Sequence, residues 1–247
     1  MTFGSLFSSI GGLDLGLERA GMECRWQVEK DQFAASILAR HWPHTKRYED
    51  ITEVSGDRLE WVDLIAGGFP CQDLSVAGRR GGISAERSGL WAHFARLVGE
   101  FRPRYVLIEN VSGLLDNEPM RRVLGDLSSR GYDAEWRMLR ASDFGAPHER
   151  ARVFIVAYAN AEHGPARLGD KQDWSMPIFA GGYPERSRFW LQASDLVARM
   201  GNGPTKQLYR PRVERIGNAV VPQVAQWIGE RIIAASTPAS AKAGGER

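Results

Sequence analysis

Residues 62–72 read VDLIAGGFPCQ, and the rest of the chain is organised around this stretch. Its first five residues, Val62 to Ala66, have the length and composition of a buried strand. Two glycines and Pro70 then end that strand abruptly. Cys71 therefore lies just past the carboxyl end of a strand, where open α/β sheets bind their ligands. A lone cysteine in a turn is more commonly a buried structural residue, so this stretch alone leaves both roles open.

The composition fits a globular protein without membrane spans. The chain has 247 residues, enough for one substantial domain or for one domain with a small annex. Hydrophobic residues make up 43% and charged residues 25%, as in soluble proteins, and no apolar stretch approaches the ~20 residues of a membrane span. The N-terminus has no signal-peptide pattern. Two cysteines cannot form a disulfide framework, so we expect a reducing compartment such as the bacterial cytoplasm or nucleoid, or a phage-infected host.

Strand-like and helix-like segments alternate along most of the chain. We expect strands at residues 2–7, 25–28, 62–66, 105–108, 134–139 and 153–156. We expect helices at residues 13–20, 32–41, 88–101, 120–127 and 222–232. This alternation is typical of an α/β fold.

Three acidic residues stand at or near strand ends. Glu29 closes the strand at 25–28, where it can accept hydrogen bonds from ribose hydroxyls. Glu109 ends the strand at 105–108, and parallel pairing would bring it to the same sheet edge as Cys71. For Asp50, which follows the next strand end, capping a helix is the commoner role.

Two stretches lack apolar periodicity. Residues 73–89 are rich in glycine and arginine, and a long loop beside a nucleophile often serves as a mobile lid. Residues 160–212 contain recurrent Gly and Pro with aromatic side chains among arginines and lysines. That mixture suits a loop-built surface that contacts nucleic acid, although an insertion with its own small core is the alternative. The net charge of +2 is too small to decide between them.

The order of these motifs resembles that of the DNA cytosine-5 methyltransferases over nearly the whole chain apart from residues 160–212 and the tail. The first motif is Phe7 to Gly12, the nucleophile motif is Phe69 to Gln72, and the cytosine-holding motif is Glu109-Asn110-Val111. Arg150-x-Arg152 and Gly217 to Pro222 are similar to the two later motifs of the family.

The resemblance implies S-adenosylmethionine as methyl donor and a Rossmann-like, mostly parallel sheet with helices on both faces. A small inserted target-recognition region completes the implied fold. The residues that it assigns to the donor are Phe7, Ser9, Ile10, Gly11, Gly12, Leu13, Glu29, Asp50, Ile51, Phe69, Pro70, Leu90, Asn218, Ala219 and Val220.

The implied reaction is methyl transfer to carbon 5 of a cytosine that is flipped out of duplex DNA. Carbon 5 is a poor nucleophile until a thiolate, here Cys71, adds to carbon 6. Glu109 would relieve the charge at N3, Arg152 would contact the cytosine carbonyl oxygen, and Arg150 completes the catalytic group. A stacked base cannot be attacked from above its plane, so flipping is required. The residues that we expect to contact DNA are Gln72, Ser75, Arg79, Arg80, Arg87, Arg186 and Arg188.

These motifs also predict the domain organisation. Residues 1–159 would form the catalytic domain, 160–212 the recognition region, 213–235 a returning C-terminal helix, and 236–247 a disordered tail. The chain departs from the family at His148, where glutamine is usual, and in a recognition region about half the expected length. We expect a monomer that binds no metal. An RNA cytosine-5 methyltransferase and an inactive DNA-binding homologue are the alternatives.

Overall fold

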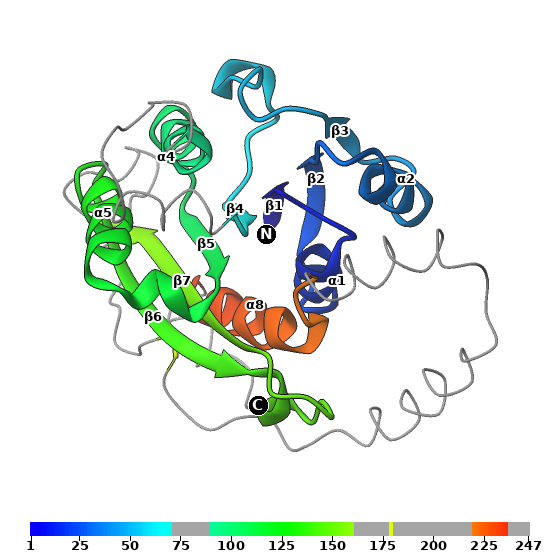
Figure 1. Ribbon diagram of the computed structural model, residues 1–247. Helices are drawn as coiled ribbons and strands as arrows, with labels where there is room; N and C mark the ends of the chain where they lie inside the picture. The colour runs from blue at the N-terminus through cyan, green and yellow to red at the C-terminus, as the bar shows by residue number, and fades with distance from the viewer. Residues whose placement is uncertain (71–88, 161–177, 180–218, 237–247) are drawn as a thin grey trace, which may run out of the picture.

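A seven-stranded sheet in the order β3-β2-β1-β4-β5-β7-β6 forms the centre of the protein (Figure 1). The computed structural model describes residues 1–70, 89–160, 178–179 and 219–236. The strands are β1 (Thr2–Leu6), β2 (Glu23–Val28), β3 (Lys46–Tyr48), β4 (Leu64–Gly67), β5 (Tyr105–Asn110), β6 (Tyr132–Arg140) and β7 (Ala151–Ala159). The neighbours from β3 to β5 pair in parallel, whereas β7 runs antiparallel to both β5 and β6. The predicted mostly parallel α/β sheet is confirmed.

Helices cover both faces of this sheet. The α-helices of the described residues are α1 (Gly12–Arg19), α2 (Gln32–His41), α4 (Gly89–Phe101), α5 (Asn117–Ser128) and α8 (Pro222–Ser236). Short 3₁₀ turns lie at η1 (Gly56–Arg58), η3 (Ser112–Leu115) and η4 (Ala141–Phe144). Apolar residues of α4 and α5 form one buried cluster with the sheet, and those of α1, α2 and α8 form the other. Because β4 and residues 105–108 of β5 are buried on both faces of the sheet, they are apolar rather than alternating.

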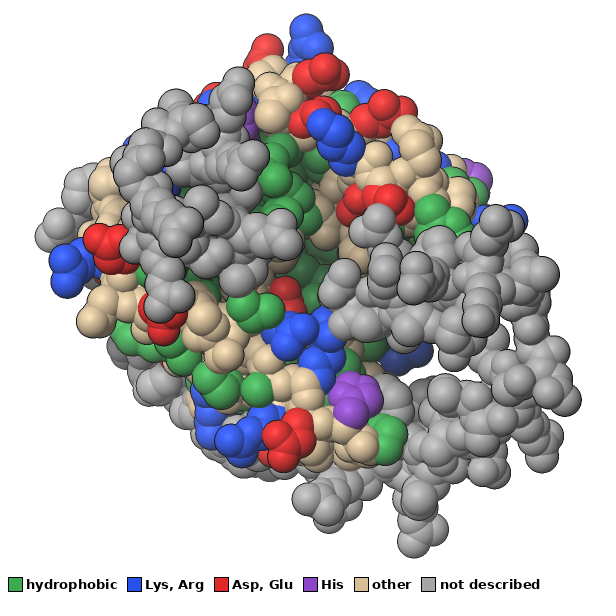
Figure 2. Space-filling view, in the orientation of Figure 1, with side chains coloured by type: hydrophobic (Ala, Val, Ile, Leu, Met, Phe, Trp, Pro, Cys, Tyr) green, Lys and Arg blue, Asp and Glu red, His purple; other side chains and the backbone are tan. Residues whose placement is uncertain are grey.

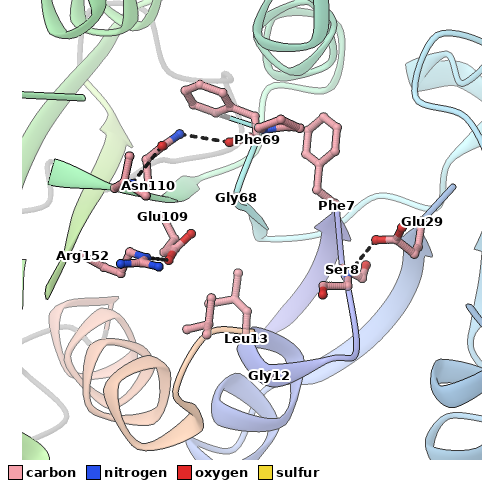
Figure 3. Close-up of a pocket in the computed structure, with 14 residues that line it drawn as sticks. Phe7, Ser8, Gly12, Leu13, Glu29, Gly68, Phe69, Glu109, Asn110 and Arg152 are labelled. Atoms are coloured by element: carbon pink, nitrogen blue, oxygen red, sulfur yellow. Dashed lines mark hydrogen bonds and ion pairs between the residues drawn. The ribbon is translucent and has the colours of Figure 1, made fainter. Parts of the chain in front are cut away.

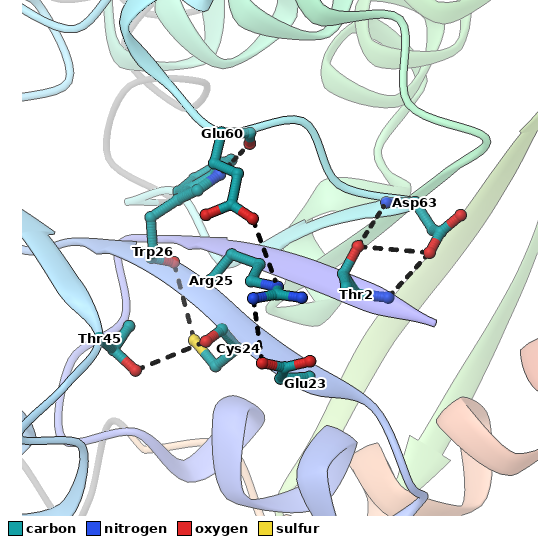
Figure 4. Close-up of polar contacts among 8 residues, drawn as sticks. All are labelled: Thr2, Glu23, Cys24, Arg25, Trp26, Thr45, Glu60 and Asp63. Carbon is teal, nitrogen blue, oxygen red and sulfur yellow. Dashed lines mark hydrogen bonds and ion pairs between the residues drawn. The ribbon is translucent and has the colours of Figure 1, made fainter.

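The strand predicted at residues 62–66 begins two residues later in the structure. β4 starts at Leu64, and hydrogen bonds fix Glu60 and Asp63, in the segment before it, to neighbouring strands (Figure 4). The Asp63 carboxylate accepts from the Thr2 backbone N–H at 2.8 Å, and the Glu60 carbonyl accepts from Trp26 Nε1 at 2.9 Å. These contacts hold the approach to β4 against β1 and β2.

The strands β6 and β7 are longer than predicted, and Arg152 lies inside β7 rather than in a loop before it. Antiparallel pairing between the two strands continues from Tyr132 with Ala159 to Arg140 with Ala151. The ladder supplies backbone partners for its polar residues, so local apolar content underestimates its length. For the same reason β5 includes Glu109 and Asn110 instead of ending before them.

Helices α1 and α8 approach each other closely because glycines line their contact. A β-carbon at Gly16 would overlap Ala225 Cβ and the Pro222 carbonyl oxygen. A β-carbon at Gly229 would lie 2.8 Å from Ala20 Cβ. The C-terminal helix therefore lies directly against the first helix of the chain, although the two are about 200 residues apart in sequence.

Candidate active site

A pocket of about 480 Å³ opens at the carboxyl ends of β1, β4 and β5 (Figure 3). A second pocket of about 490 Å³ adjoins it, and both are lined by Phe7, Glu29 and Pro70. Figure 2 shows this face hollowed, with apolar side chains on the walls, an acidic side chain at the centre and basic side chains along one rim. Open α/β sheets bind ligands at this edge.

The loop after β1 forms one wall of the first pocket through backbone that is held in an unusual conformation. Phe7 and Ser9 have positive φ angles of 55° and 51°, which cost on the order of 1–3 kcal/mol each in non-glycine residues. Hydrogen bonds hold them there, because the Ser8 N–H donates to the Val28 carbonyl and the Ser9 N–H to Glu29 Oε2. Strain of this kind is typical of a ligand site.

Glu29 stands at the junction of the two pockets. Its Oε2 accepts from Ser9 N–H at 2.7 Å and its Oε1 accepts from Asp31 N–H at 2.8 Å (Figure 3 shows the first). Both bonds fix the orientation of the carboxylate. Each oxygen keeps a second lone pair, so the group can still accept hydrogen bonds from a ligand.

Asp50 lies in the second pocket with Ile51 and Leu90. The hydrogen bond from Lys30, 2.6 Å away, and two bonds from Thr52 lower the pKa of Asp50 to about 2. Asp50 is therefore an ionised acceptor. Its bond from Thr52 N–H closes a turn, so the helix cap that we considered for Asp50 is replaced by a local turn.

Glu109 and Arg152 form an ion pair in the wall of the first pocket. Arg152 Nε lies 3.2 Å from Glu109 Oε1, because β7 pairs with β5 and presents its arginine beside the carboxylate (Figure 3). Glu109 is 9% exposed. Burial raises its pKa, and the charges of Arg152 and Arg150 oppose that shift without cancelling it. A β-carbon at Gly68 would lie 2.7 Å from Glu109 Oε2, so a larger residue there would displace this carboxylate.

Asn110 fixes the turn that leads to Cys71. Its Nδ2 donates to the Phe69 carbonyl at 3.0 Å, its Oδ1 accepts from Val111 N–H at 2.9 Å, and the side chain is buried. The Phe69 ring in turn packs on Trp91 with 5.1 Å between centroids. Pro70, which immediately precedes Cys71, is thereby held in the wall of both pockets.

The sequence profile of the C-5 cytosine-specific DNA methylase family matches residues 1–191. The chain belongs to this family. Type II methyltransferase M2.BsuMI of Bacillus subtilis is 39% identical over 184 residues, covering 72% of this chain and 46% of that protein. Type II methyltransferase M.HgiCII of Herpetosiphon aurantiacus is 34% identical over 199 residues, covering 79% of this chain and 42% of that protein. The chain thus spans about half the length of the curated relatives that it matches.

A crystal structure of a Spodoptera frugiperda DNMT2 mutant has the same fold. It superposes with a TM-score of 0.56 over 94% of this chain and 97% of that one, at 15% identity. At this identity the likeness shows the fold alone.

Most residues that the family resemblance assigned to the donor line one of the two pockets, among those that the structure describes. They are Phe7, Ser9, Gly12, Leu13, Glu29, Asp50, Ile51, Phe69, Pro70, Leu90 and Val220. The predicted catalytic residues Glu109 and Arg152 line the first pocket with them. Ile10, Gly11, Ala219 and Arg150 line neither pocket. Gly11 instead faces Trp42, whose ring a β-carbon at Gly11 would overlap, and Arg150 acts on Glu109 through its charge.

Several predicted residues lie outside the described part of the chain. They are Cys71, Gln72, Ser75, Arg79, Arg80, Arg87, Arg186, Arg188 and Asn218. Ser8, Gly68, Asn110 and Val111 also line the first pocket, although none of them was predicted individually as a site residue. The sequence carried a signal for them, because Ser8, Asn110 and Val111 lie within two of the family motifs and Gly68 immediately precedes Phe69.

The described residues hold neither a candidate metal cluster nor a candidate membrane span. Among them, no group of three or more His, Cys, Asp or Glu side chains is placed to hold a metal ion. No helix within the same ranges has the length and apolar character needed to cross a membrane.

Proposed function

We propose that this chain transfers a methyl group from S-adenosylmethionine to carbon 5 of a flipped-out cytosine in duplex DNA. The observation that carries the proposal is the ion pair of the buried Glu109 with the half-buried Arg152, set beside the turn that leads to Cys71. A carboxyl whose pKa is raised by burial, with a guanidinium next to it, can hold the polar edge of a pyrimidine. Membership in the C-5 cytosine-specific DNA methylase family supports the same chemistry.

The two adjoining pockets suit the methyl donor. Glu29, at their junction, is placed to accept hydrogen bonds from ribose hydroxyls. Asp50 would accept from the adenine amino group, with Ile51 and Leu90 as apolar neighbours of the ring. Bound there, S-adenosylmethionine supplies an electrophilic methyl group.

Three residues of this chain have separate roles in the reaction. The Cys71 thiolate adds to carbon 6 of the cytosine, and electron density moves toward carbon 5 and N3. Because the pKa of Glu109 is raised, it can share its proton with N3 and relieve that charge. Arg152 contacts the carbonyl oxygen of the base and orients Glu109. As carbon 5 takes the methyl group, the bond from that group to the donor sulfur would break and S-adenosylhomocysteine would be the leaving group. A base then removes the carbon 5 proton, the bond between carbon 6 and the Cys71 sulfur breaks, and the thiolate leaves.

Residues 160–212 would supply sequence recognition, because a single base in a pocket carries no information about its neighbours. Arginine forks at guanine are the commonest specific base contact. We propose Arg186 and Arg188 for this role, and Arg79, Arg80 and Arg87 for phosphate contacts. These five arginines lie outside the described ranges, and the sequence pattern is what supports their proposed roles.

The deciding experiment measures transfer of a labelled methyl group from S-adenosylmethionine to duplex DNA and, in parallel, to transfer RNA. We expect label in DNA for the full-length chain, and loss of at least a hundredfold for Cys71→Ser and Glu109→Gln. Cys24→Ser is the matched control, because burial raises the pKa of that thiol and keeps it unreactive.

The other outcomes separate the alternatives. Label in transfer RNA but not in DNA would make the chain an RNA methyltransferase. Label in neither, with S-adenosylmethionine still bound by the wild type in calorimetry, would make it an inactive homologue.

A further inference from the structure

Two residues from the middle of region 160–212 are held against the catalytic sheet by side chains of β6. The Ile178 backbone N–H donates to Glu135 Oε1 at 3.2 Å. Arg137 Nη1 donates to the Phe179 carbonyl oxygen at 2.6 Å. Glu135 and Arg137 are two residues apart on one strand, so both point to the same face of the sheet.

The side chains of Ile178 and Phe179 are also buried. Ile178 is 2% exposed and Phe179 is 8% exposed, and both belong to the core cluster that α8 shares with the sheet. The Phe179 ring stacks near Trp227, with 6.4 Å between centroids and 26° between planes. The Arg231 guanidinium lies 3.7 Å from the centroid of the same indole.

We propose that Glu135 and Arg137 are positioning residues that fix the recognition region relative to the catalytic pocket. We call these two side chains with Ile178 and Phe179 the clamp. Bonds to two consecutive backbone groups, one acceptor and one donor, determine the orientation of the segment as well as its place. Because they engage the backbone, they hold the segment independently of the bases that the region reads. This inference rests on the proposed function.

The clamp limits the distance between the proposed base-reading arginines and the catalytic sheet. Arg186 is 7 residues beyond Phe179, so it lies within about 25 Å of the clamp even if the chain is fully extended. Without the clamp, the nearest described position is Asn160, 26 residues away, and the upper limit on the distance of Arg186 from a described position rises to about 90 Å. The effective concentration of an arginine at its target base falls as the volume accessible to that arginine grows. Loss of the clamp should therefore weaken base recognition.

The sharpest test compares Arg137→Ala and Glu135→Ala with Trp136→Ala. Trp136 lies between them on β6, is 49% exposed and points to the other face, so its variant controls for changes to the strand itself. We expect the two clamp variants to raise the KM for DNA, or to lower the preference for the favoured site in bisulfite sequencing, by about tenfold. The kcat at saturating DNA and the affinity for S-adenosylmethionine should stay within about twofold of wild type.

Arg137→Lys should restore most of the preference, because a lysine can still donate to the Phe179 carbonyl. A purely structural role would instead lower kcat, thermal stability and donor affinity together, and such a result would overturn the proposal. So would an unchanged KM and site preference in both alanine variants.

Hydrogen exchange separates failure of the clamp from failure of the proposed function. The Ile178 amide should be protected in wild type, and its exchange should speed up at least tenfold in Glu135→Ala but not in Trp136→Ala. Unchanged exchange would refute the clamp even in an active enzyme. If the wild type methylates no nucleic acid, the proposed function fails and the exchange result still decides whether the clamp exists.

Discussion

Asp14 on α1 should make the stability of this protein fall as the pH rises from acid to neutral. Its side chain is fully buried, and its Oδ atoms accept hydrogen bonds from the neutral side chains of Ser5 and Gln27, at 3.2 and 3.1 Å. Burial raises the pKa of Asp14 from 3.8 to about 6, against these hydrogen bonds, which lower it. The native state therefore binds this proton more tightly than the unfolded chain does.

The size of the effect follows from the shift. About two pKa units correspond to about 3 kcal/mol between the fully protonated and fully ionised forms. This contribution is complete below pH 3.8, declines as the pH rises to about 6, and is absent above that value. Between pH 5 and pH 7.5 the part that is lost is about 1.4 kcal/mol.

Urea unfolding of wild type and Asp14→Asn at pH 5 and pH 7.5 measures this directly. The asparagine can accept from Gln27 and donate to Ser5, and it does not ionise. We therefore expect the stability of Asp14→Asn relative to wild type to rise by about 1.4 kcal/mol across that interval. Asp133→Asn, at an exposed position of β6, should show no such change. A difference that stays constant with pH for Asp14→Asn would mean that this carboxyl ionises at its ordinary pKa, and the reasoning would be refuted.

Of three further predictions, two concern the pocket and one the packing of α1 against α8. DNA that carries 5-fluorocytosine should form a covalent adduct with wild type and Cys24→Ser when S-adenosylmethionine is present, but not with Cys71→Ser; denaturing gels would show the reverse pattern if the nucleophile is misassigned. Glu29→Ala and Asp50→Ala should each weaken S-adenosylmethionine binding roughly tenfold to a hundredfold in calorimetry, and unchanged affinity in both would mean that the donor binds elsewhere. Gly16→Ala should lower the free energy of unfolding by about 1–3 kcal/mol because α1 and α8 must separate, and equal stability in urea would contradict that packing.

The parts of the fold that are encoded locally could be predicted from sequence. Helix α2 was predicted at its observed bounds, Gln32–His41. The structure shows that its start is encoded locally, since Asp31 accepts from the Ala34 N–H and caps the helix. The site motifs were recognisable because each is contiguous. Contacts between distant segments could not be predicted. The bond from Asn110 to the Phe69 carbonyl joins residues 41 apart, and the clamp on Phe179 joins residues 42 apart. No local pattern marks either bond, since each depends on the order of strands in the sheet.

Helix α8 connects the donor pocket to the clamp, so a substitution that displaces this helix should affect both. Val220, just before the helix, lines the first pocket, and a β-carbon at Gly12 would overlap its carbonyl oxygen. Trp227, one and a half turns into the helix, packs near Phe179 of the clamp. Since a helix transmits a displacement as a rigid body over such a short length, moving α8 should disturb donor affinity and target preference together. Arg137→Ala, which leaves α8 in place, should disturb target preference alone, so the two kinds of variant distinguish a shift of the shared helix from a release of the recognition region.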